Sequence, residues 1–208
     1  MPAYFCLNIE LSITPNAVKY FLAALQKSGA TFKSGYWDGE HDSLEEIIAW
    51  NQEYIERNTW CWDKNTQQWK HKQFLFDYDG FSECRLYTYP LNDENTFLSR
   101  LIIPEDDFYE YTRVNGSLST YEKRDRMESV KQLALRIWEY SQALSIQTEW
   151  ECSDCAPHYM EIVEGTPPQV EPFCIIPTKA YREEWNMTCV PTARNGVLIE
   201  NERNWFYN

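Results

Sequence analysis

The chain has 208 residues, 43% of them hydrophobic and 16% aromatic, so it can bury a full core, and disorder is excluded as its main state. It holds 19 Lys and Arg against 32 Asp and Glu, which gives a net charge of −13. Phosphate backbones and anionic lipid surfaces repel so acidic a chain, and nucleic-acid or membrane binding is therefore not expected.

The N-terminal region predicts a strand followed by a helix. Apolar and polar residues alternate strictly over 5–13, the pattern of a half-buried strand. Thr14-Pro15 then supplies an N-cap with proline at the first helical position. Apolar residues at helical spacing follow, and Gly29 is placed to end the helix.

Two further helices are predicted downstream. One opens at Ser43, where Glu46 completes a capping box. The longest covers about 120–144, with Val130, Leu133 and Ile137 on one side. Alternation over 146–151 then indicates a strand.

The middle of the chain is rich in predicted strands. Runs at 74–78 and 81–89 flank Asp79-Gly80, a dipeptide typical of two-residue hairpin turns. Such a turn pairs Phe76 with Glu83 and mixes polar and apolar residues on both faces, so the hairpin is predicted without a definite register. Another strand is expected over 97–103, before Pro104.

The C-terminal quarter predicts a strand over 173–176 and a hairpin around Asn195-Gly196. The proline-rich segment from Gly165 to Pro172 is an internal loop, because too little chain follows it to form a second core. We therefore expect one domain, 1–208. The interspersed, alternating strands favour an α+β fold, with a largely antiparallel sheet and three or four helices packed on it.

Seven cysteines form an odd, scattered set in a chain that lacks the basic start of a signal peptide and any apolar run long enough to span a bilayer. We read them as reduced thiols, which predicts a cytoplasmic protein.

The strongest metal motif is Cys152-Ser153-Asp154-Cys155 with His158 three residues further on. Two thiolates at this spacing can bind one zinc ion, and His158 is placed to be a third ligand. No second Cys-x-x-Cys pair accompanies them, so two partly buried thiols around a turn are the alternative interpretation. No cofactor other than zinc is indicated.

Acidic and aromatic residues supply candidates for partner binding. Glu149 and Glu151 point to the same side of their predicted strand, and Asp154 follows closely. A solvated strand face explains these carboxylates without a catalytic role, since no lysine or histidine adjoins the pair. Trp60 and Trp62 are candidate interface anchors, with core packing as the alternative.

The sequence contains no phosphate-binding glycine loop, nucleophile elbow or His-Glu-x-x-His helix, which lowers the expectation of an enzyme. We therefore favour a non-catalytic, acidic protein-binding domain. A concrete form is an inhibitor or immunity-type protein that neutralises a basic toxin or nuclease. The alternatives are a zinc-binding protein or metal-dependent enzyme that uses Cys152, Cys155 and His158, a subunit of a larger assembly, and acidity that serves solubility alone. The sequence does not indicate an oligomeric state.

Overall fold

A computed structural model describes residues 4–57, 62–63, 68–69, 71–91, 95–114, 117–150 and 156–201. Its centre is a nine-stranded antiparallel sheet with the strand order β12-β13-β11-β10-β1-β7-β6-β5-β2. The strands are β1 (Tyr4–Ser12), β2 (Thr31–Trp37), β5 (Lys72–Asp77), β6 (Cys84–Leu91), β7 (Thr96–Pro104), β10 (Ser145–Trp150), β11 (Phe173–Pro177), β12 (Cys189–Thr192) and β13 (Gly196–Glu200). The α-helices within these residues are α1 (Ala17–Lys27), α2 (Leu44–Arg57), α3 (Arg124–Tyr140) and α4 (Tyr159–Glu164). The predicted α+β fold is confirmed.

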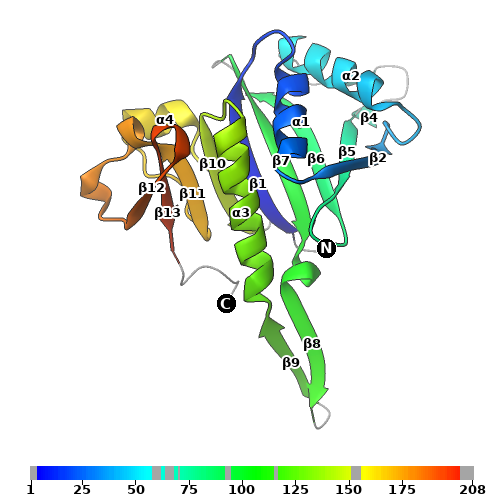
Figure 1. The fold of residues 1–208 in the computed structure, drawn as a ribbon. Coiled ribbons are helices and arrows are strands. Elements are labelled where there is room, and N and C mark those ends of the chain that lie inside the picture. Colours follow the sequence, from blue (N-terminus) through cyan, green and yellow to red (C-terminus); the bar gives the residue numbers. More distant parts are fainter. Residues whose placement is uncertain are drawn as a thin grey trace.

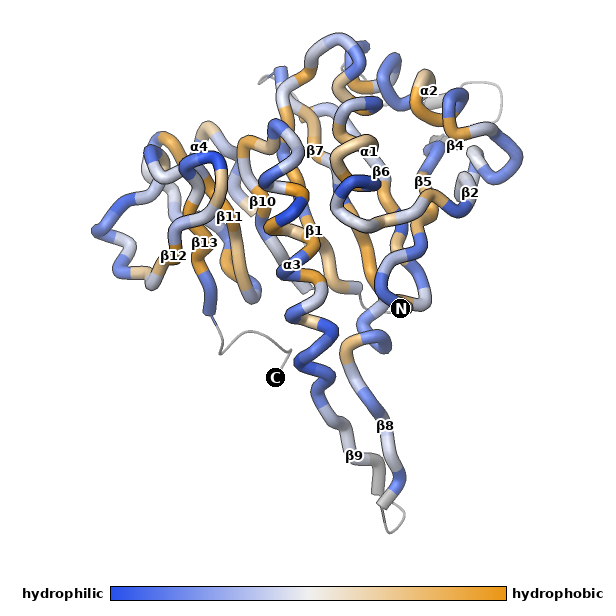
Figure 2. Tube along the Cα trace, in the orientation of Figure 1, coloured by the Kyte–Doolittle hydropathy of each residue, from blue (hydrophilic) through white to orange (hydrophobic). Residues whose placement is uncertain are grey.

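The two faces of the sheet carry different cores. Helices α1, α2 and α3 cover one face (Figure 1), and alternate residues of β1, such as Leu7 and Ile9, are fully buried beneath them. Successive residues of β11 point to opposite faces. Ile175 therefore joins this large core, whereas Cys174 joins a smaller one with Ile162 of α4. The sheet strands are largely hydrophobic, while the lower half of α3 is hydrophilic (Figure 2).

The start of α1 differs from the prediction, and the start of α2 agrees with it. Asn16, in the left-handed conformation with φ 62°, is the N-cap of α1, because residues before it form a turn in which the Ala17 N–H donates to the Thr14 carbonyl at 3.1 Å. The predicted capping box at α2 is confirmed. The Ser43 N–H donates to Oε2 of Glu46 at 2.8 Å, and the Glu46 N–H donates back to Oγ of Ser43 at 3.3 Å.

The predicted central hairpin forms between β5 and β6, with a register that the two-residue turn did not give. Phe76 lies opposite Cys84 rather than Glu83, because the connection is longer than two residues. Phe74 then lies opposite Leu86 on the same buried side. The observed register makes this face apolar, whereas on the other face Leu75 lies opposite Arg85.

The predicted helix over 120–144 is wrong at its N-terminal end. Residues 117–122 form β9 (Ser117–Glu122), which pairs with β8 (Tyr109–Val114) in a separate two-stranded sheet, and α3 begins only at Arg124. This pair, the β8–β9 arm, projects beyond the end of the main sheet (Figure 1). Thr120 and Tyr121, which the prediction placed in the helix, are residue types that favour a strand. A second small sheet joins β3 (Trp62–Asp63) to β4 (Gln68–Trp69).

The C-terminal part completes the same sheet. The segment 165–172 connects α4 to β11, and the chain on both sides of it contributes strands to one sheet. The predicted hairpin around Asn195-Gly196 forms from β12 and β13, which pair antiparallel with Thr192 opposite Gly196. Short 3-10 helices fill the remaining turns at Glu105–Phe108, Thr178–Ala180, Glu183–Trp185 and Ala193–Asn195. No helix in the described residues has the length and apolar character needed to span a membrane.

Candidate functional site

On the face of the sheet opposite α1, a buried polar network connects three strands. Asn8 of β1 lies opposite Arg100 of β7, and Glu149 extends from β10 on the other side of β1. Asn8 Nδ2 donates to Oε1 of Glu149 at 2.9 Å, and Arg100 Nε donates to Oδ1 of Asn8 at 2.6 Å. Arg100 Nη2 lies 3.3 Å from Oε1 of Glu149 in an ion pair that is almost wholly buried.

Two tyrosines of β6 complete the surroundings of Arg100. Nη1 donates to the Tyr87 hydroxyl at 3.0 Å, and the guanidinium carbon lies 5.6 Å from the ring centroid of Tyr89. The charged atoms of this buried ion pair bond to one another and to neighbouring side chains, which such a pair requires to be stable. Its evident role is to hold β1, β6, β7 and β10 together.

The structure brings two predicted site residues to this region. His158, the N-cap of α4, lines a cavity of about 330 Å³ together with Asn8 and Arg100, which both bind Glu149. The backbone N–H of His158 donates to Glu161 at 2.7 Å. Glu149 is fully buried, so the expectation of a solvated strand face is wrong at this position, and its carboxylate faces Arg100 rather than an exposed partner surface.

The other predicted site residues are Trp60, Glu151, Cys152, Asp154 and Cys155, which lie outside the described residues, and Trp62, of which only the backbone is described. In the part of the chain that the structure describes, no three His, Cys, Asp or Glu side chains gather as metal ligands do. The zinc site stays a prediction, because two of its three proposed ligands lie outside that part.

The cysteines differ from the expected reduced set. Cys6 is disulfide-bonded, and its partner is not one of the other described cysteines, since Cys84, Cys174 and Cys189 are free. Burial raises the pKa of the Cys84 thiol to about 12 and that of Cys174 still further, so both are protonated and unreactive. Disulfides persist mainly in oxidising compartments, so the cytoplasmic location stays a prediction.

A second kind of site lies on the opposite, helical face. Between α1 and α2 runs a groove of about 630 Å³, which we call the α1–α2 groove. Ala23 and Ala49, both exposed, line it with small side chains. Leu22 and Ile48 form an apolar floor between them.

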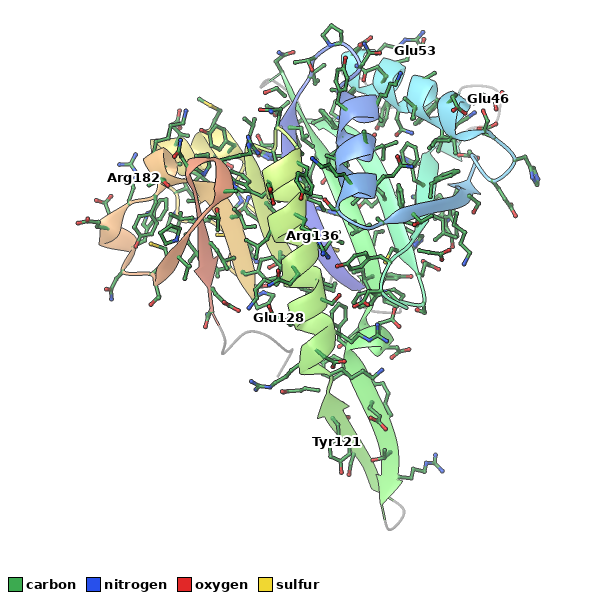
Figure 3. The ribbon with its side chains drawn as sticks, in the orientation of Figure 1. Glu46, Glu53, Tyr121, Glu128, Arg136 and Arg182 are labelled. Atoms are coloured by element: carbon green, nitrogen blue, oxygen red, sulfur yellow. The ribbon has the colours of Figure 1, made fainter. Side chains whose placement is uncertain are left out.

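Exposed carboxylates line this groove. Glu45, Glu53 and Glu56 of α2 contribute to its wall, and Lys19 of α1 is the one cation among the described residues of the lining. Figure 3 shows Glu53 on the outer side of α2, away from the sheet. Glu53 pairs with Arg57, but no described Lys or Arg pairs with Glu45 or Glu56. The groove is therefore negatively charged above an apolar floor.

The chain around the groove is strongly acidic. Residues 38–57 hold seven carboxylates and one arginine, so 20 residues carry a net charge of −6 out of −13 for the whole chain. Comparing the two halves of the sequence hides this concentration, whereas counting charges in a 20-residue window finds it. Such a count of charges along the sequence could have indicated this site.

Comparisons with known proteins give little beyond the geometry. No family model matches the sequence, and no curated protein matches it. Among solved structures, the chain is similar to the Pseudomonas aeruginosa T6SS protein PA0821, with a TM-score of 0.45 and 8% sequence identity. The similarity covers 96% of this chain and 64% of that protein, so this chain spans less than two thirds of its length.

Proposed function

We propose that this chain is a non-catalytic, acidic protein-binding domain, and that it acts as an inhibitor or immunity-type protein for a basic partner such as a toxin or nuclease. The observation that carries the proposal is the α1–α2 groove, which combines an apolar floor with exposed glutamates. A basic amphipathic segment of the partner would pack apolar side chains on Leu22 and Ile48. Its lysines or arginines would then face the carboxylates of α2.

The charge of the groove would act chiefly on the rate of association. A cleft lined by charges of one sign raises the on-rate of an oppositely charged partner by about 10- to 1,000-fold at low salt. Glu45 and Glu56 contribute to this field without being neutralised by a described Lys or Arg. Binding should accordingly weaken as salt rises, because exposed charges are screened beyond about 10 Å at 0.1 M ionic strength.

The buried network supports a binding role over a catalytic one. The charged atoms of Arg100 and Glu149 bond to each other and to Asn8 and Tyr87, so they hold the sheet together. The free thiols of Cys84 and Cys174 are buried and protonated, which excludes them as nucleophiles.

The test compares two triple variants that change the net charge equally. Glu45→Gln/Glu53→Gln/Glu56→Gln removes the carboxylates of the groove. Glu164→Gln/Glu183→Gln/Glu184→Gln removes three exposed carboxylates from the C-terminal part of the chain. Each protein is used to isolate partners from its own host, and the association rate with any purified basic partner is measured at 50 and 500 mM salt.

We expect the wild type and the C-terminal variant to bind and inhibit the same basic protein. The groove variant should associate about tenfold more slowly or not at all. If the association rate fell equally in both variants, the effect would come from net charge alone, and the groove would not be the binding site. A partner that is bound independently of salt, or bound without inhibition, would contradict the inhibitor function.

A further inference from the structure

A second groove lies on the other side of α1, between that helix, the end of α3 and the 3-10 turn Ala193–Asn195. Its volume is about 660 Å³, and we call it the α1–α3 groove. Tyr20, Phe21 and Tyr140 supply aromatic surface, and Tyr20 is 66% exposed at the rim. An exposed aromatic side chain beside a cavity is a common feature of ligand sites.

The charge of this groove is opposite to that of its neighbour. Lys27 and Arg194 are the charged side chains in its described lining, which contains no carboxylate. Two cations without an acid are unexpected in a chain with a net charge of −13. They create a local positive field on an otherwise acidic protein.

Arg194 is held in place by an unusual backbone conformation. Its φ of 55° lies in the left-handed region, which non-glycine residues seldom adopt. Nη1 donates to the carbonyl of Trp138 in the last turn of α3 at 2.7 Å, and the guanidinium lies 4.9 Å from the Trp138 ring. None of the ion pairs in the described residues includes Arg194, and burial lowers the pKa of its guanidinium without a compensating carboxylate.

The donors of Arg194 are only partly used. A guanidinium has five N–H groups. One bonds to Trp138, and Nη2 makes a long contact of 3.5 Å with the carbonyl of Ala143. The remaining donors can form the paired hydrogen bonds with which arginine binds a phosphate or carboxylate.

Lys27 supplies the second positive charge from the last turn of α1. Its ammonium lies 3.9 Å from the ring centroid of Tyr140, a cation–π contact that positions the charge without neutralising it. None of the ion pairs between described residues includes Lys27. Both cations of the groove are thus available to an anion.

We propose that the α1–α3 groove binds a small organic anion, and that a phosphate monoester with an aromatic body fits it best. A phosphate monoester carries a charge close to −2 at pH 7, which matches Lys27 and Arg194 together. The aromatic body would pack against Tyr20 and Tyr140. The two grooves share Ala23 in their linings, but their charged side chains differ, so either proposal can fail without the other.

The experiment titrates the full chain with phenyl phosphate, phenol and inorganic phosphate, and follows binding by calorimetry and by NMR. Phenyl phosphate should bind more tightly than either of the other two, because only it offers both the charge and the ring. Lys27→Gln should weaken phenyl phosphate binding about tenfold, since a charge-assisted contact is lost. Lys19→Gln is the matched control on the same helix, because Lys19 lines the other groove, and it should leave this affinity unchanged.

Arg194→Gln provides a second variant, with its melting temperature measured in parallel because Arg194 also bonds to the end of α3. It should lose phenyl phosphate binding at temperatures where it remains folded. Equal affinities in wild type and Lys27→Gln would overturn the site. Phenol bound as tightly as phenyl phosphate would overturn the role of charge, and inorganic phosphate bound as tightly would overturn the aromatic component.

Discussion

The two grooves that flank α1 have nearly equal volumes, about 630 and 660 Å³, and opposite charges. Helix α1 contributes one lysine to each, Lys19 on one side and Lys27 on the other. The sign of each groove is therefore set by the facing wall, which is α2 with its glutamates in one case and the turn with Arg194 in the other. A net charge of −13 does not predict the sign of a particular cavity, because that sign depends on which elements the fold places opposite each other.

The largest effect is expected from damage to the sheet on which both grooves rest. Arg100→Leu leaves the carboxylate of Glu149 buried without its cation, and removing one partner of a buried ion pair costs about 3–5 kcal/mol. We expect this loss in the free energy of unfolding, measured by urea denaturation, together with equal impairment of both grooves.

The control is the double variant Arg100→Leu/Glu149→Leu. Replacing both charges of a buried pair by apolar residues is often neutral, so the double variant should recover at least half of the lost stability. A double variant less stable than Arg100→Leu would show that the network stabilises the sheet through contacts other than this pair.

Two buried glycines allow each groove to be damaged separately. A Cβ at Gly35 would overlap the carbonyl oxygen of Gly39 and approach Cδ1 of Ile47 in α2 to 2.7 Å. A Cβ at Gly196 would come within 2.6 Å of Oγ1 of Thr192 and would overlap the indole nitrogen of Trp138, the residue that contacts Arg194. Forced overpacking of this kind costs about 1–3 kcal/mol.

Gly35→Ala should therefore weaken partner binding and spare phenyl phosphate binding, whereas Gly196→Ala should do the reverse. Both variants are measured by calorimetry after thermal melts have confirmed that they are folded. If either substitution impaired both ligands equally, the grooves would not be independent sites.

Local patterns account for the parts of the fold that the sequence predicted well. Alternation along β1 and the Ser43–Glu46 capping box act within a few residues, so a single sequence contains the whole signal. The register of β5 and β6 could not be predicted, because it depends on the length of the turn between them. The first strand of the β8–β9 arm was not predicted, and residues 120–122 of its second strand were assigned to the following helix.

The sites themselves depend on contacts that no local pattern records. Glu149 is buried because Asn8, 141 positions earlier, and Arg100 converge on it across three strands. The α1–α2 groove is lined by residues of two helices that the fold brings side by side, among them Ala23 and Ala49. Only the run of carboxylates over 38–57 was visible in the sequence, and it identifies the charge of α2 without showing the apolar floor beside it.

A smaller effect is expected at the N-terminus of α2, where the helix begins to form the acidic wall. Ser43→Ala removes the cap and should reduce the free energy of unfolding by about 1 kcal/mol. Fraying of the first turn would displace Leu44 and Glu45 from the groove, so the association rate with the partner should fall while phenyl phosphate binding stays unchanged. Ser43→Asp retains a capping oxygen and should behave like the wild type in both assays.

The smallest expected effect is a change in the pH dependence of stability, which should differ between the acidic wall at α2 and the wall that contains Arg194. The Ser43 N–H, and then its hydroxyl, hold the pKa of the exposed Glu46 carboxylate below the ordinary glutamate value of 4.5. A group whose pKa is lower in the folded state stabilises that state fully above its unfolded pKa and loses this contribution as the pH falls through the folded pKa.

Glu46→Gln should therefore lower the melting temperature at pH 7, and the difference from wild type should shrink as the pH falls below 4.5. Glu45→Gln, outside the capping box, is the control and should show no such convergence. Arg194, at the other groove, stays charged across this range. The difference in melting temperature between wild type and Arg194→Gln should therefore not shrink as the pH falls.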